Sequence, residues 1–297
     1  MHNTFYKDSL TNRKTYLDAI RILAIFLVIF NHTPAYHFPY HPGGEQYNIY
    51  VMLFISGLTK IAVPLFFMIS GAVLLAKAET IRTVLKKRAL RILCLIILFQ
   101  LIQFSFYGIC FHNGEHKLNF YSFLSACFSG HSFVTNRTSA AAVWFLYAYL
   151  AFILFLPFLR FMVKNMKNEH FYYLGMIQIF SLVVIPCVGD LLPNDEPFKS
   201  HINNYLSICQ LPFIWVLAGY FIEHRVNIDK VKLHHLASLF ALSFLMISIV
   251  TFLPEIKRIQ NNEAYVHQGV PAVIPYLLIP CITLFLLAKK NIYYTSS

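Results

Sequence analysis

The chain has 297 residues, of which 58% are hydrophobic and only 12% are charged, and its mean hydropathy is +0.58. Soluble domains carry a charge on roughly a quarter of their residues, so this composition excludes an ordinary soluble domain and predicts a polytopic membrane protein. The net charge of +11 does not indicate a nucleic-acid-binding protein, because Lys and Arg fall in short clusters between apolar runs and not on one patch.

Apolar segments long enough to cross a bilayer recur along the whole chain, each approaching the roughly 20 residues that a spanning helix needs. They lie near residues 17–34, 50–76, 89–110, 141–160, 171–188, 203–222, 236–253 and 270–288. These segments predict an all-α polytopic transmembrane helix bundle of about eight spans. Since the sequence shows neither an internal repeat nor a long linker, we expect a single membrane-embedded domain over residues 1–297.

The positive charges of the loops predict the orientation of the chain, because cytoplasmic loops carry the excess of Lys and Arg. With the N-terminus inside, seventeen basic residues fall on the inner side and five on the outer side. The inner set is Lys7, Arg13, Lys14, Lys77, Arg82, Lys86, Lys87, Arg88, Arg91, Arg160, Lys164, Lys167, Arg225, Lys230, Lys232, Lys289 and Lys290, and the outer set is Lys117, Arg137, Lys199, Lys257 and Arg258. An even number of spans then places both termini in the cytoplasm.

Two polar side chains stand out in the first predicted span, which contains the run RILAIFLVIFNH over residues 21–32. Arg21 and His32 are eleven residues apart, which on a helix is three turns plus about 20°, so they share one face about 16 Å apart. Ionisable groups inside spans usually face the bundle interior or a water-filled cavity. The alternative is that Arg21 reaches the inner headgroups and that His32 is an ordinary interfacial histidine.

The stretch YLDAIRILAIFLVIFNH resembles the opening of the acyltransferase-3 family of bacterial integral-membrane acyltransferases. The first span of that family carries an R-x10-H motif, which Arg21 and His32 match, and Asp18 fits the same pattern. Three later stretches agree in the order that the family shows: VPLFFMISGAVLL (63–75), KKRALRIL (86–93) and VWFLYAYLAFILFLPFL (143–159). The resemblance covers residues 16–160, and the usual bundle of the family has ten spans.

The resemblance implies an O-acyltransferase in the bacterial inner membrane. Such an enzyme moves an acyl group, usually acetyl, from a cytoplasmic acyl-CoA such as acetyl-CoA to a hydroxyl of a cell-surface glycan or its lipid-linked precursor. It implies acyl-CoA as co-substrate, no bound cofactor, the lipid bilayer as surroundings and no nucleic acid as partner.

His32 matches the essential histidine of the family, and its imidazole, with an ordinary pKa near 6.5, suits a general base for the acceptor hydroxyl. A covalent acyl-imidazole intermediate is the alternative route. Arg21 would line the same cavity and orient the donor or polarise its carbonyl.

Arg88 and Arg91 match the R-x-x-R block of the family. At i and i+3 they share a helix face, and the guanidinium fork suits bidentate contacts to the phosphates of CoA. The alternative is that the basic residues between Lys77 and Arg91 anchor the loop against anionic lipid. Ser70 and Gly71 predict a close backbone approach between spans.

Two other classes of function stay open. A transporter or flippase of a lipid-linked sugar would use Arg21 and His32 to bind an anionic headgroup, although an internal repeat would then be expected. An inactive, truncated member of the family is the second alternative, because the chain has about eight predicted spans instead of ten. We expect no metal site, since no spacing gathers the outer histidines, which are His37, His41, His112, His116 and His131.

Overall fold

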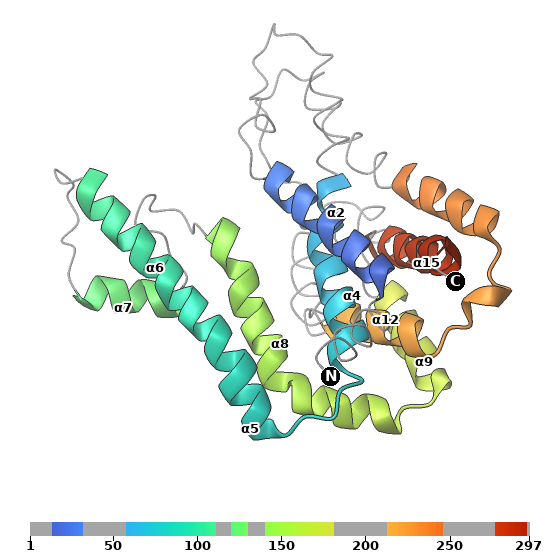
Figure 1. Ribbon diagram of the computed structural model, residues 1–297, viewed down its shortest axis with the longest axis horizontal. Helices are drawn as coiled ribbons and strands as arrows, with labels where there is room; N and C mark the ends of the chain where they lie inside the picture. The colour runs from blue at the N-terminus through green and yellow to red at the C-terminus, as the bar shows by residue number, and fades with distance from the viewer. Residues whose placement is uncertain are drawn as a thin grey trace, which may run out of the picture. The chain divides into compact units, whose positions relative to one another are not determined.

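The computed structural model describes residues 14–31, 58–110, 120–129, 140–180, 213–245 and 277–295. Within these ranges the chain is helical and contains no strand, which confirms the all-α prediction for this part of the protein (Figure 1). The chain divides into a discontinuous unit, Met1–Leu74 with Met166–Ser297, and a continuous unit, Leu75–Asn165.

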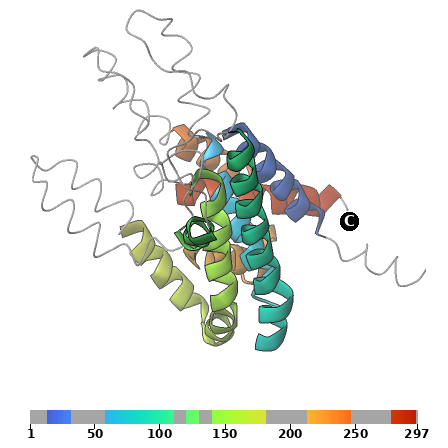
Figure 2. The same ribbon diagram turned by 90° about the vertical axis from the view of Figure 1, so that its left-hand side faces the viewer.

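The continuous unit is built on two long helices, α6 (Leu90–Cys110) and α8 (Ala140–Asn165), which pack against each other in both views (Figures 1 and 2). A single turn, α5 (Ile81–Thr83), and a π-helix, η2 (Val84–Ala89), lead into α6. Thr80 caps this entry, because its hydroxyl accepts a hydrogen bond from the Thr83 backbone N–H at 3.3 Å. Most side chains of α6 are exposed and apolar, as a helix surrounded by lipid requires.

The discontinuous unit is centred on α4 (Ala62–Leu74), which is apolar around its whole circumference and mostly buried. A helix of that composition belongs in a core. The helices that contact α4 are α2 (Thr15–Asn31), α12 (Phe213–His224) and α15 (Leu278–Thr295). The unit also contains α9 (Asn168–Ile179), the 3₁₀ turn η5 (Ile228–Lys230) and the helix Leu233–Leu245.

Two glycines bring α4 and α12 into unusually close contact. A Cβ atom added to Gly71 would lie 1.9 Å from the backbone oxygen of Val216, and one added to Gly219 would lie 1.9 Å from the backbone oxygen of Met68. Each glycine therefore faces the backbone of the other helix. This arrangement confirms the close approach that we predicted at Gly71, and small residues are the usual means of such contacts in membranes.

A helix overlaps each of the segments that the sequence predicts as spans. Among the described residues, two helices are long and apolar enough by length and composition to cross a membrane, Ile81–Phe106 and Trp144–Asn165. Shorter apolar helices are Ala62–Leu74, Phe213–His224 and Leu233–Leu245. The number of spans and the cytoplasmic position of the termini stay predictions.

One described helix was not predicted. The helix α7 (Phe120–Ser129) packs against α6 between the third and fourth predicted spans. It has ten residues, which at 1.5 Å per residue is too short to cross the hydrocarbon. Its apolar run is therefore too short to be predicted as a span.

Candidate active site

Arg21 lies on α2 beside the stripe of residues that the helix buries. The buried residues are Tyr16, Leu17, Ile20, Ala24 and Leu27. Arg21 itself keeps 44% of its side chain exposed, and its Nη1 donates to Asp18 Oδ1 at 2.6 Å. An acidic neighbour at i−3 on the same helix limits the directions that the guanidinium can take.

His32 lies outside the described residues, so its shared face with Arg21 and its catalytic role stay predictions. The helix α2 continues regularly to Asn31, the residue before it. Asn31 Oδ1 accepts hydrogen bonds from Thr59 Oγ1 at 3.0 Å and from Lys60 Nζ at 3.3 Å. A polar cluster of three side chains thus joins the C-terminal end of α2 to the chain that enters α4.

A second polar cluster holds the opposite end of α2. Glu223, at the end of α12, accepts hydrogen bonds from Lys14 and from the hydroxyl of Tyr16. Lys289 of α15 lies 3.6 Å from Glu223 Oε2 and also donates to the backbone oxygens of Ile222 and Glu223, at 2.8 and 3.0 Å. These contacts satisfy the last carbonyls of α12 and fix the start of α2.

The cluster around Glu223 joins basic residues that the loop charges assign to one side of the membrane. Lys14 and Lys289 both belong to the predicted inner set, and both contact Glu223. Residues at helix ends can contact each other in a membrane protein when those ends lie on the same side of the bilayer. That this side is the cytoplasmic one stays a prediction.

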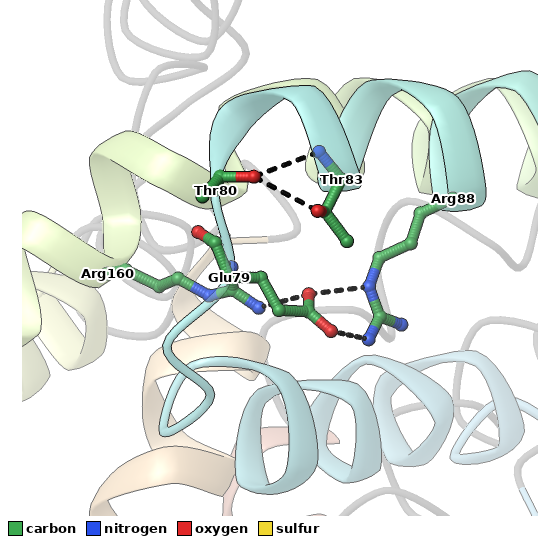
Figure 3. A network of polar contacts seen from close by, with 5 residues as sticks. All are labelled: Glu79, Thr80, Thr83, Arg88 and Arg160. Carbon is green, nitrogen blue, oxygen red and sulfur yellow. Dashed lines mark hydrogen bonds and ion pairs between the residues drawn. The ribbon is translucent and has the colours of Figure 1, made fainter.

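The continuous unit contains an ion-pair network centred on Glu79, which precedes the capping residue Thr80 (Figure 3). Arg88 Nη2 donates to Glu79 Oε1 at 2.6 Å, and Arg88 Nε donates to Glu79 Oε2 at 2.9 Å. This is the bidentate geometry in which a guanidinium binds a carboxylate most strongly. Arg160 of α8 donates from Nη2 to Glu79 Oε2 at 2.9 Å and from Nη1 to the Glu79 backbone oxygen at 3.5 Å.

Glu79 is ionised at neutral pH. Its hydrogen bonds with Arg88, and then with Arg160, lower the pKa of the carboxyl group to about 2. The carboxylate therefore carries its charge over the whole physiological range, and both guanidinium groups have a permanent anionic partner.

Arg88 and Arg91, which the sequence predicts as a pair, have different surroundings. Arg88 lies in the π-helix η2 with 26% of its side chain exposed, and its guanidinium is held by Glu79. Arg91 lies in the first turn of α6 with an exposed side chain. Their role in donor binding stays a prediction, but the structure fixes the orientation of Arg88 in a way that the spacing alone does not show.

The sequence reasoning missed Glu79, and it assigned Arg160 only to the inner set of charges. One signal was present: Glu79 is an acidic residue in a loop that is otherwise basic. The hydrogen bond from Lys60 to Asn31 was not predicted either, because Lys60 lies within the second predicted span and the partner of its ammonium group depends on tertiary packing.

Within the described ranges, no group of three or more His, Cys, Asp or Glu residues could hold a metal ion. The outer histidines His37, His41, His112, His116 and His131 all lie outside those ranges. The absence of a metal therefore stays an expectation from the sequence.

Comparison with known proteins finds one family model that matches nearly the whole chain. The model of a family described as an acyltransferase domain matches residues 14–293. No curated protein and no solved structure matches the chain. The matched region includes all the described helices apart from the end of α15, and both R-x10-H and R-x-x-R lie inside it. The chain therefore belongs to the acyltransferase-3 family.

Proposed function

We propose that this protein is an O-acyltransferase of the bacterial inner membrane that moves an acyl group, usually acetyl, from cytoplasmic acyl-CoA to a glycan hydroxyl on the outer side. The acceptor is a cell-surface glycan or its lipid-linked precursor. The observation that carries this proposal is the family match over residues 14–293, which includes the motifs that we assign to chemistry and to donor binding.

In the proposed reaction the acceptor oxygen attacks the thioester carbonyl. A C–O bond forms, the C–S bond breaks, and the free thiol of CoA leaves. His32 takes the proton from the attacking hydroxyl and returns it to the departing sulfur. Arg21 stabilises the negative charge that develops on the carbonyl oxygen, and Asp18 restricts the position of its guanidinium.

A membrane location of this chemistry suits the described helices. The helix Ile81–Phe106 is long and apolar enough to cross a bilayer, and Arg88 lies in its first turns. A CoA phosphate bound at Arg88 would stay in the aqueous phase, while the acyl-thioester end of the donor enters the protein.

Donor binding gives the first test of the proposal. Replacing Arg88 and Arg91 together with Gln should weaken the binding of CoA to the purified protein by about 3 kcal/mol, since each charge-assisted hydrogen bond contributes about 1.5–3 kcal/mol. Isothermal titration of the wild type and the double variant measures the effect. Arg82→Gln removes an exposed positive charge from the same segment and should leave the Kd of CoA unchanged, and an unchanged Kd in the double variant would leave the pair as a lipid anchor.

The orientation of the chain is tested by labelling single cysteines in a cysteine-free background. A membrane-impermeant maleimide added to intact cells should label Asn194→Cys, on a predicted outer loop, and should miss Arg82→Cys, on the predicted inner loop. The seventeen-to-five distribution of loop charges is the physical reason. Labelling of Arg82→Cys alone would reverse the topology and remove the cytoplasmic donor from the proposal.

A further inference from the structure

We propose that Glu79 is a positioning residue for the acyl donor. Its carboxylate, which Arg160 also binds, fixes the guanidinium of Arg88 so that Nη1 can contact a phosphate of CoA. This inference rests on the proposed function, because it assumes a phosphate-bearing donor. It adds two residues that the R-x-x-R motif does not contain.

The geometry of Arg88 leaves one part of its guanidinium for a ligand. Glu79 receives hydrogen bonds from Nε and Nη2. The remaining nitrogen, Nη1, points away from Glu79 in Figure 3. Arg88 retains 26% of its side-chain exposure, whereas Arg160 retains 11%. An incoming anion can therefore reach Arg88, whereas the more buried Arg160 holds the Glu79 carboxylate in place.

Glu79 is itself fixed from two directions. Arg160 contacts both its carboxylate and its backbone oxygen, and the capped turn that begins at Thr80 fixes the chain immediately after it. A guanidinium that is already ordered need not be immobilised when the donor arrives, so less of the binding free energy is lost to side-chain ordering.

The charges of the network also suit an anionic ligand. Two guanidinium groups and one carboxylate leave an excess of one positive charge. Without the carboxylate, Arg88 and Arg160 would repel each other and Arg88 would turn toward solvent or lipid headgroups. Glu79 therefore keeps Arg88 in place without removing its attraction for phosphate.

A double-mutant cycle separates this role from a general structural one. Glu79→Gln should raise the Kd of CoA for the purified full-length protein on the order of tenfold, the loss expected when one charge-assisted contact is weakened. In an Arg88→Gln background the same substitution should change the Kd by less than about twofold, because its effect passes through Arg88. Glu169→Gln, which removes an exposed carboxylate from α9, is the matched control and should bind CoA like the wild type.

The outcomes distinguish the inference from the proposed function. The positioning role is wrong if the wild type binds CoA and Glu79→Gln binds it equally well. It is also wrong if Glu79→Gln raises the Kd of CoA by the same factor in the wild-type and the Arg88→Gln backgrounds. If the wild type binds no CoA, the donor assignment itself fails. Glu79→Asp, which keeps the charge on a shorter side chain, provides a second variant if Glu79→Gln does not fold, and its smaller loss of affinity should also depend on Arg88.

Discussion

His32→Ala should lose acyl transfer by about 10² to 10⁴, the usual contribution of a positioned acid-base group. The variant should still be expressed and inserted, because removing a polar group near a helix end relieves a desolvation cost and removes little packing. The contacts of Asn31 with Thr59 and Lys60 hold the end of α2 independently of the histidine. Acetylation of the outer-surface glycan, measured in cells at matched protein levels, gives the result.

Two companion variants sharpen this experiment. Arg21→Lys keeps the positive charge beside Asp18 but loses the planar fork, so transfer should fall if Arg21 acts on the donor and should persist if it only reaches the headgroups. His234→Ala removes an exposed histidine from the helix Leu233–Leu245 and should have no effect. Full activity in His32→Ala would exclude the histidine from the mechanism and favour a transporter.

Gly71→Ala should cause a large loss of stability. The new Cβ would lie 1.9 Å from the backbone oxygen of Val216 and 2.6 Å from its carbonyl carbon. Because both are backbone atoms, no rotamer change relieves the overlap, and α4 and α12 must move apart. Overpacking of a core usually costs about 1–3 kcal/mol, and we expect the upper end, about 3 kcal/mol, since two buried helices lose contact.

Thermal unfolding of the purified protein in detergent measures this effect, and the chain offers a matched control. Gly175 lies on α9, and beyond its chain neighbours and the backbone of its own helix no atom lies within 4 Å of an added Cβ. Gly175→Ala should therefore be neutral or stabilise the helix by up to about 1 kcal/mol. Gly219→Ala should behave like Gly71→Ala, because it meets the backbone oxygen of Met68 at the same distance. Equal melting temperatures for Gly71→Ala and Gly175→Ala would contradict the close crossing of α4 and α12.

The positions of the long helices follow from the sequence for a simple physical reason. In lipid every backbone polar group must be satisfied within the chain, so an apolar run of spanning length has to be a helix. The described helices accordingly overlap all the predicted spans, and the missed helix α7 is too short for that rule to apply. The motif that identifies the family is also local, because R-x10-H needs only one helix with a regular period.

The partners of these residues could not be predicted in the same way. Gly71 indicated a close contact, but only the packing of α4 against α12 showed that Gly219 faces it in return. Arg88 and Arg91 were predicted as partners because helical periodicity is a local property. The carboxylate that binds Arg88 comes instead from the loop before the helix, and the second arginine on that carboxylate, Arg160, comes from α8.

The sequence alone therefore determined which long apolar segments contain helices in the described part of the chain, since lipid exposure and helical periodicity act on neighbouring residues. The chemical roles of Arg21, His32, Arg88 and Arg91 stay predictions. Tertiary structure decided which charged residues form ion pairs. Lys14 and Lys289, from different helix ends, both bind Glu223, and Arg88 binds Glu79. Such pairs depend on how helices that are distant in the sequence pack together, and their apolar faces are too similar for composition to specify the neighbour.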